Sequence, residues 1–229
     1  MAEKNNPRRP APAPGDGGIL VIGLGRFGSA IAETLAQSER DVLAVERSPE
    51  LVAHWAGRIA LVEADATNPV ALEQVGVRDY PTAVVAVGSH LEASVLITAN
   101  LVDLGVPQIW AKAISNEHAR ILERIGAHHV VRPEAEAGER VAHLVSGKLL
   151  DYIEVEDGFT IVKMRPPREL EGFTLAQSHV RTKYGVTVIG VKSPGLDFRY
   201  AQPDTRISVN DTLIVAGHPD LLERFSRRP

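Results

Sequence analysis

A glycine-rich segment from Gly23 to Gly28, with the sequence GLGRFG, carries the clearest chemical signal in this chain. It follows an apolar run of strand character and precedes a stretch with helical periodicity, which is the setting of a dinucleotide-binding turn. In such a turn the first glycine permits the tight bend, the second (Gly25) lets a phosphate approach the backbone, and the third lets the helix pack closely on the strand. The N–H groups at the helix N-terminus then attract phosphate. The segment predicts a nucleotide site at Gly23, Gly25 and Gly28, with Phe27 in the same turn.

An acidic residue stands at the spacing where such a site binds ribose. Glu46 ends the second predicted strand, where a carboxylate accepts a hydrogen bond from the ribose 2′-hydroxyl. The alternative is an ordinary solvated residue at a strand end. The charge of Glu46 disfavours a 2′-phosphate, although the neighbouring Arg47 is of the type that binds one. We therefore expect a nucleotide with an unphosphorylated ribose, and we include both residues in the candidate site.

Further candidates follow the third and fourth predicted strands. Asp65 and Ala66 come after the third strand, and Gly88 and Ser89 come after the fourth. Ligands of open α/β sheets bind at these carboxyl ends of the strands, so the four residues are expected near the nucleotide. Asp65 could equally cap the next turn.

The elements that must position these residues alternate regularly. Short apolar runs of strand character alternate with amphipathic stretches of helical length, which is typical of βαβ units and a parallel sheet. Expected strands cover residues 19–22, 41–46, 59–63, 83–87, 109–113 and 128–132, and expected helices cover residues 26–36, 50–56, 70–75, 91–104, 116–125 and 134–150. Because the strands are almost continuously apolar, we expect helices on both faces of the sheet. The predicted fold class is α/β, with a Rossmann-like doubly wound parallel sheet over residues 18–150.

The pattern changes near Leu150 and predicts a second, smaller α+β domain over residues 151–229. Its expected strands cover 152–155, 159–164, 186–191 and 212–216, and its expected helices cover 175–180 and 220–225. A domain this small buries little surface when it folds alone, so we expect it to pair with a second copy. Residues 1–17 are rich in proline and lack the apolar segment of a secretory signal, so we expect a disordered tail.

Composition excludes several classes of function. The net charge of −4 and the pI near 6.1 show no basic footprint for nucleic acid. The chain has no cysteine, which removes disulfides, thiolate nucleophiles and Cys-ligated zinc together. The apolar runs are too short to span a membrane, so any membrane role is expected to be peripheral. No hydrolase or zinc motif is present, and we expect a protein that is not an enzyme; an NAD-dependent oxidoreductase stays as the alternative, because a Rossmann fold alone does not decide function.

Several segments together resemble one family. The glycine turn, EADAT at 63–67, IWAKA at 109–113, LERIGA at 122–127 and Pro133-Glu134 resemble the RCK (regulator of potassium conductance) or TrkA-N domain of Ktr/Trk-type potassium-uptake regulators. VRTKYGVTV at 180–188 and DTLIVAG at 211–217 are similar to the TrkA-C domain of the same proteins. The resemblance spans Gly18 to Phe225 and favours the KtrA-like regulators.

This resemblance implies a cytoplasmic regulatory subunit, peripheral to the membrane, that gates a potassium-translocating subunit of the KtrB or TrkH type. The subunits would form dimers within an octameric ring, switched by ATP against ADP or, in Trk-type relatives, by NAD(H). Arg26 would reach the terminal phosphates of a nucleotide in a neighbouring subunit, and Lys112 would lie near the phosphates. Glu134 would help to hold Mg²⁺ or Ca²⁺ at the ATP site. Without the family, Arg26 and Lys112 are solvated residues, and Glu134 is an acid favoured by the helix dipole.

The resemblance also implies a second-messenger site, since some relatives bind cyclic di-AMP between two C-terminal domains. Arg181 would contact the phosphates through its planar guanidinium, and Val188 and Ile189 would form an apolar floor. The alternative for Arg181 is a solvated or helix-capping charge.

Overall fold

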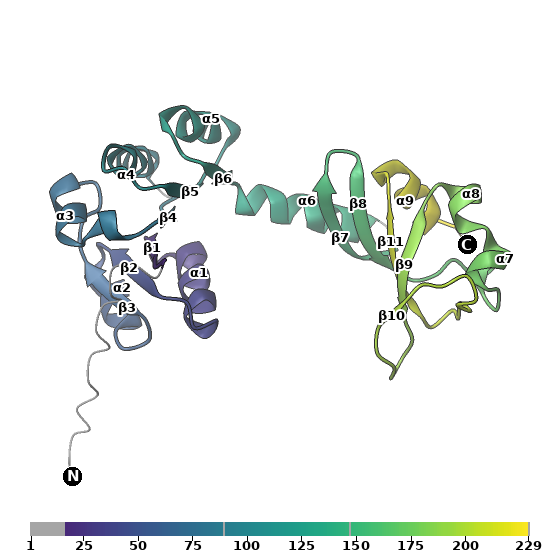
Figure 1. Ribbon diagram of the computed structural model, residues 1–229. Coiled ribbons are helices and arrows are strands. Elements are labelled where there is room, and N and C mark those ends of the chain that lie inside the picture. Colours follow the sequence, from purple (N-terminus) through teal and green to yellow (C-terminus); the bar gives the residue numbers. More distant parts are fainter. Residues whose placement is uncertain (1–16, 89, 147, 229) are drawn as a thin grey trace, which may run out of the picture. The chain divides into compact units, whose positions relative to one another are not determined.

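The structure, a computed structural model, describes residues 17–88, 90–146 and 148–228. The chain divides into two compact units, one ending at Glu134 and one beginning at Ala135 (Figure 1). The tail expected at residues 1–17 lies outside the described residues except for Gly17, and so does the candidate site residue Ser89.

The first unit is built on a six-stranded parallel sheet with the order β3-β2-β1-β4-β5-β6. Its strands are β1 (Ile19–Ile22), β2 (Val42–Glu46), β3 (Ala60–Glu63), β4 (Thr82–Val85), β5 (Gln108–Lys112) and β6 (His129–Val131). Its helices are α1 (Arg26–Gln37), α2 (Pro49–Trp55), α3 (Pro69–Gln74), α4 (Leu91–Asp103) and α5 (Asn116–Ile125), with a short 3₁₀ turn η1 at Val77–Asp79. The predicted Rossmann-like doubly wound sheet is confirmed.

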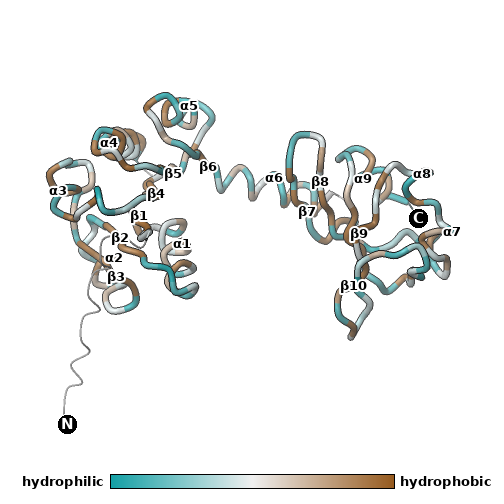
Figure 2. Tube along the Cα trace, viewed as in Figure 1, coloured by the Kyte–Doolittle hydropathy of each residue, from teal (hydrophilic) through white to brown (hydrophobic). Residues whose placement is uncertain are grey.

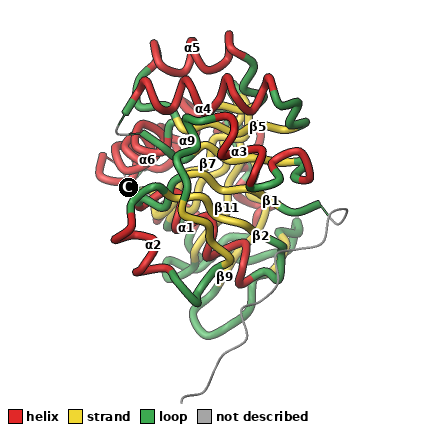
Figure 3. Tube along the Cα trace, turned by 90° about the vertical axis from the view of Figure 1, so that its left-hand side faces the viewer, coloured by secondary structure: helices red, strands yellow, loops and turns green. Residues whose placement is uncertain are grey.

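Two hydrophobic clusters cover the two faces of this sheet. One joins the strands to α3, α4 and α5 through residues such as Leu72, Leu101 and Leu122. The other joins them to α1 and α2 through Ala32 and Trp55. Figure 3 shows α4 and α5 together on one side of the strands, and Figure 2 shows hydrophobic residues along the strands. Both faces of β2 are therefore buried, which explains its uninterrupted apolar sequence.

Local capping residues set the starts of several helices. Proline occupies the first position of α2 and α3, where its missing N–H costs no hydrogen bond. Ser48 and Asn68 precede these prolines and accept hydrogen bonds from backbone N–H groups of the first turns. The two helices begin one residue before the expected ranges of 50–56 and 70–75, at Pro49 and Pro69, and local sequence explains these starts.

The second unit is a smaller α+β module with a five-stranded antiparallel sheet of order β10-β9-β11-β8-β7. Its core packs helices against one face through residues such as Met164, Val215 and Phe225. The elements are α6 (Pro133–Ser146), β7 (Leu149–Glu156), β8 (Phe159–Met164), η2 (Arg168–Leu170), α7 (Leu175–Ser178), α8 (Val180–Tyr184), β9 (Thr187–Lys192), β10 (Arg199–Tyr200), β11 (Thr212–Gly217) and α9 (Pro219–Ser226). No helix in the described ranges is long and apolar enough to cross a membrane.

The boundary between the units lies earlier than the sequence suggested. The helix expected over 134–150 ends at Ser146, and Leu149 is already paired with Met164 in the sheet. Residues of α6 contact this sheet: Arg140 forms an ion pair with Asp151, and the His143 ring stacks on Tyr152 with centroids 4.0 Å apart. These contacts assign most of α6 to the second unit rather than to a first domain ending at residue 150.

Two further elements of the second unit differ from expectation. The helix expected over 175–180 is replaced by α7 and α8, because His179 adopts a left-handed conformation with φ of 48° between them. The short strand β10 was not expected; it pairs with β9, and Phe198, just before it, packs over Gly190.

Candidate nucleotide-binding site

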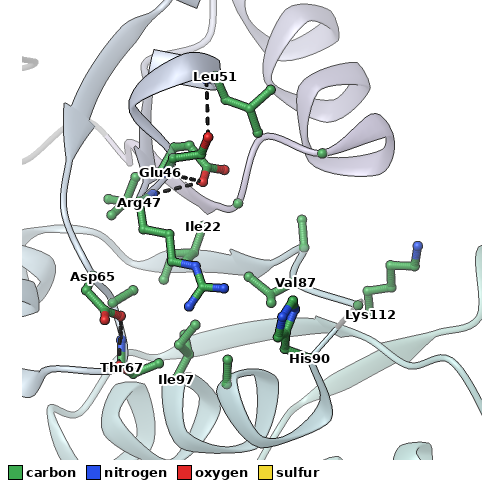
Figure 4. Close-up of a pocket in the computed structure, with 18 of the residues that line it drawn as sticks. Ile22, Glu46, Arg47, Leu51, Asp65, Thr67, Val87, His90, Ile97 and Lys112 are labelled. Atoms are coloured by element: carbon green, nitrogen blue, oxygen red, sulfur yellow. Dashed lines mark hydrogen bonds between the residues drawn. The ribbon is translucent and has the colours of Figure 1, made fainter. Parts of the chain in front are cut away.

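A cavity of about 370 Å³ lies at the carboxyl ends of the parallel strands (Figure 4). The chain leaves β1 toward β2 on one side and reaches β4 on the other, so the strand order reverses beside β1. Ligands of open α/β sheets bind at this topological switch point. Of the residues expected in the site, the cavity is lined by Gly23, Gly25, Arg26, Phe27, Glu46, Arg47, Asp65, Ala66, Gly88 and Lys112.

The three glycines of the turn have three separate reasons to be glycine. Gly23 has φ of 92°, and a Cβ there would lie 2.9 Å from Val87. A Cβ at Gly28 would lie 1.9 Å from the carbonyl oxygen of Gly23, so Gly28 serves close packing and does not line the cavity. A Cβ at Gly25 would meet no atom within 4 Å. Only Gly25 keeps space open for a ligand.

The N-terminus of α1 faces this space without a side-chain cap. Gly25 is the residue before the helix, and neither a capping hydrogen bond nor an acidic side chain occupies the first turn. The first N–H groups of a helix lack partners within the helix and carry a partial positive charge. Arg26 is exposed at the same point. This end of the cavity is suited to phosphate.

Glu46 is buried, with 8% of its surface exposed, and its carboxylate is held by the backbone. Oε2 accepts a hydrogen bond from the Leu24 N–H at 2.6 Å, and Oε1 accepts from Arg47 and Ser48 at 2.9 and 2.8 Å. Glu46 therefore ties the glycine turn to the end of β2. A carboxylate has about four lone-pair positions, so one acceptor position is left for a ribose hydroxyl. The structure thus adds a structural role that the sequence did not reveal.

Lys112 and Glu134 meet beside the phosphate end. The Lys112 ammonium donates to Glu134 at 2.6 Å and lies 5.6 Å from the centre of the Phe27 ring. The hydrogen bond from Lys112, together with the charge of Arg26, lowers the pKa of Glu134. Glu134 does not line the cavity itself but reaches it through Lys112. The structure therefore brings together four residues that were predicted separately: Arg26, Phe27, Lys112 and Glu134.

The opposite end of the cavity lies between the ends of β2 and β3. Asp65 accepts hydrogen bonds from Thr67 Oγ1 at 2.7 Å and from Thr67 N–H at 3.0 Å. These bonds, with a smaller contribution from the charge of Arg47, lower the pKa of Asp65. Asp65 is therefore both a turn cap and a lining residue, as the two alternatives from sequence allowed.

Several lining residues were not expected from sequence. They come from the helices and turns that follow the strands, and no local motif distinguishes them: Ser48, Leu51, Thr67, Val87, His90, Ala93 and Ile97. Only their positions just after β2, β3 and β4 give a signal. No group of three potential metal ligands occurs among the described residues, so Glu134 alone does not form a cation site.

A second cavity, of about 410 Å³, lies beside α7, α8 and β9 in the second unit. Arg181 and Val188 line it, and Arg181 Nε donates to Thr187 Oγ1 at 3.2 Å. Ile189 is not among the lining residues, because neighbouring residues of a strand point to opposite faces.

Known families and relatives match nearly the whole chain. The TrkA-N domain matches residues 19–133, and the TrkA-C domain matches residues 159–228. The chain is 35% identical over 209 residues to the Ktr system potassium uptake protein A of Bacillus subtilis strain 168, covering 90% of this chain and 94% of the relative. It is 31% identical over 210 residues to the protein of the same name from Vibrio alginolyticus, covering 91% and 96%.

Solved structures agree on the fold. The crystal structure of the GsuK RCK domain superposes with a TM-score of 0.67 at 19% identity and covers 95% of this chain but 49% of that one. A structure of the GsuK channel bound to NAD gives the same TM-score at 18% identity, covering 96% and 40%. The relatives from Bacillus and Vibrio are named as potassium uptake proteins, which agrees with the expectation of a protein that is not an enzyme. The chain belongs to the Ktr family of potassium uptake proteins, with a TrkA-N domain followed by a TrkA-C domain.

Proposed function

We propose that this protein is the nucleotide-sensing regulatory subunit of a potassium-uptake transporter. It would act in the cytoplasm, bound to a potassium-translocating membrane subunit of the KtrB or TrkH type. Family membership supports the transport role, since relatives named for potassium uptake match at least 90% of the chain. The cavity at the ends of β1 to β5 is the single observation that carries the sensing role.

The cavity contains groups suited to each part of an adenine nucleotide. The uncapped start of α1 and Lys112 suit the phosphates, and the remaining acceptor position of Glu46 suits a ribose hydroxyl. The apolar residues Leu51 and Ile97 also line the cavity and would contact the base. ATP and ADP are the proposed ligands.

The difference between ATP and ADP would act at Arg26, Lys112 and Glu134. The Lys112 ammonium lies 2.6 Å from the Glu134 carboxylate. A terminal phosphate would compete with that carboxylate for the ammonium. Mg²⁺ or Ca²⁺ bound to that phosphate would gain Glu134 as an oxygen ligand, the type both ions prefer. If the groups belong to neighbouring subunits of a dimer or octameric ring, the two nucleotides would favour different ring geometries.

NAD(H) is the second candidate ligand. Glu46 retains an acceptor for a ribose hydroxyl in either nucleotide, and a GsuK channel of the same fold has been solved with NAD bound. A Trk-type regulator that senses NAD(H) would use the same glycine turn. Direct comparison of binding decides between the two.

The test is calorimetric titration of the full chain with ATP, ADP and NAD⁺, using Gly25→Val as the site variant. A Cβ at Gly25 meets no atom within 4 Å, and the φ of −65° suits any residue, so the variant should fold normally. We expect the wild type to bind and the variant to lose binding, because the side chain would fill the space for phosphate. A variant that binds as well as wild type would remove the turn from the site.

The second cavity is the proposed site for cyclic di-AMP. Arg181 offers a planar guanidinium for phosphate, and Val188 offers apolar surface for a base. Arg181→Ala should abolish binding of cyclic di-AMP and leave ATP binding unchanged, whereas Arg224→Ala, outside the cavity, should change neither. Calorimetry with both ligands checks this, and wild type without detectable binding would end the assignment.

A further inference from the structure

Arg47 enters the nucleotide cavity in a way that the proposed binding of phosphate and ribose does not use. Its backbone N–H is fixed by the carboxylate of Glu46 at 2.9 Å, so the side chain starts from a rigid point at the end of β2. Figure 4 shows the side chain extending into the cavity, with the guanidinium on the side where Asp65, Val87 and Ile97 are drawn. The residue is exposed and lines the cavity.

No side-chain hydrogen bond or ion pair holds this guanidinium among the residues that the structure describes. Asp65 is the acid that senses its charge, but the Asp65 carboxylate is already bonded to Thr67. An arginine that is not committed to a protein partner keeps its planar face and its donors available to a ligand.

A 2′-phosphate is a poor partner for Arg47. It would have to lie beside Glu46, whose carboxylate is held in place by three backbone N–H groups and cannot turn away. The negative charges of a 2′-phosphate and of the neighbouring Glu46 carboxylate repel each other in a partly buried site. The ligand group left for Arg47 is therefore the one beyond the ribose, at the far end of the cavity.

We propose that Arg47 is a specificity-determining residue that stacks its guanidinium on the purine base of the bound nucleotide, across the cavity from Ile97. This rests on the proposed nucleotide-binding function and assigns recognition of the base within it. A guanidinium over an aromatic ring gains cation–π attraction, and Ile97, which lines the cavity, offers an apolar contact for the other face. The turn from Asp65 to Thr67, fixed by its own hydrogen bonds, would border the edge of the base.

The test compares two ligands on three forms of the full chain. ATP carries the base, and inorganic triphosphate carries the phosphates without it. The variants are Arg47→Ala and, as a control with the same change in charge, Arg40→Ala, which is exposed and does not line the cavity. We expect Arg47→Ala to weaken ATP binding by roughly 5- to 30-fold, the range of stacking on a base, and to change triphosphate binding by less than about 3-fold. Arg40→Ala should leave both unchanged.

Three other outcomes have distinct meanings. Equal losses for ATP and triphosphate in Arg47→Ala would show that Arg47 acts only as a charge, and would overturn the stacking role. If Arg47→Ala bound ATP as tightly as Arg40→Ala does, the stacking role would be overturned as well. A wild type that binds neither ATP, ADP nor NAD⁺ would overturn the proposed function itself, and the role of Arg47 with it. Arg47→Lys adds a check, because lysine keeps the charge but lacks the planar face, and should recover only part of the lost ATP affinity.

Discussion

The Lys112 ammonium contacts both the aromatic ring of Phe27 and the carboxylate of Glu134 at the edge of the nucleotide cavity. The Lys112 side chain is mostly buried, with 12% exposed, whereas that of Glu134 is 63% exposed. Glu134 is therefore the more solvent-accessible partner, and in the proposed function it is the one that an incoming phosphate would displace. In the proposed function, the displaced carboxylate would then bind a cation on the nucleotide.

Glu134→Gln should weaken the dependence of ATP binding on Mg²⁺ or Ca²⁺ and leave ADP affinity nearly intact. The amide lacks the negative charge that a hard cation prefers. Calorimetric titrations with and without each cation measure the effect, with Glu139→Gln on the same helix as a control. Equal dependence on the cation in Glu134→Gln and wild type would remove Glu134 from the site.

At the residue scale, strand-end positions predicted some of the residues that meet at the cavity but not what each would do, and Arg26, Lys112 and Glu134 were expected only from the family resemblance. The strand-end positions of Asp65 and Gly88 placed them correctly at the cavity, since the carboxyl ends of parallel strands share one edge of the sheet. The three backbone hydrogen bonds to Glu46 could not be foreseen, because they depend on the fold of the turn around it. The same applies to His90, which no motif distinguishes.

At the scale of elements, helix α5 contains a fully buried histidine. His118 lies in the first turn of the helix, and its Nδ1 accepts a hydrogen bond from the Ile114 N–H at 3.3 Å. Its Nε2 is buried without a hydrogen-bond partner among the described residues. Burial disfavours the charged ring and lowers the pKa of His118 from its ordinary value of 6.5. In the unfolded chain this histidine takes up a proton more readily than in the folded one.

The first unit should therefore lose stability as the pH falls below about 6.5, by at most about 1.4 kcal/mol per pH unit from this group. The sign follows because the unfolded state binds more protons there, so its free energy drops relative to the folded state. Both tryptophans, Trp55 and Trp110, lie in this unit, so urea unfolding followed by tryptophan fluorescence reports on it alone. The His118→Asn variant should show a smaller change in its free energy of unfolding as the pH falls. A wild type whose stability is constant from pH 7 to pH 5.5 contradicts the prediction.

Elements with strong periodicity were predicted well, and the exceptions have physical causes. All six parallel strands were expected, since each is a short apolar run between helical stretches. The end of α6 was misplaced because Val141, Val145 and Leu149 continue a helical spacing, although Leu149 belongs to the sheet. The break between α7 and α8 depends on the left-handed conformation of His179, which is uncommon for a residue other than glycine and invisible in the sequence.

At the scale of the whole molecule, the proposed switch requires that groups from two subunits contact the terminal phosphate of ATP. ATP carries one phosphate more than ADP, and Arg26 is the exposed cation at the start of α1. A preference of about 10- to 100-fold for one ring geometry, or about 1.4 to 2.7 kcal/mol per site, is sufficient when several sites act together. The required coupling is thus small for each subunit.

Arg26→Ala should uncouple the nucleotide from transport while leaving the fold intact, because the side chain is exposed. Potassium flux through the reconstituted transporter complex, measured with ATP and with ADP, tests this for wild type and variant. If the wild type transports potassium equally with ATP and with ADP, the proposed switch is wrong. If Arg26→Ala keeps the full difference in flux between ATP and ADP, only the role of Arg26 is wrong.

The fixed position of Glu46 also has a consequence in time. Because its carboxylate holds the N–H groups of Leu24, Arg47 and Ser48, the chain itself fixes the shape of the glycine turn and needs no nucleotide to hold it. A site that needs no rearrangement is entered at about 10⁶ M⁻¹s⁻¹, and for a dissociation constant of about 1 μM the bound nucleotide then leaves after roughly one second. The protein would therefore follow changes in cellular energy with a delay of seconds, set by how long each nucleotide stays bound.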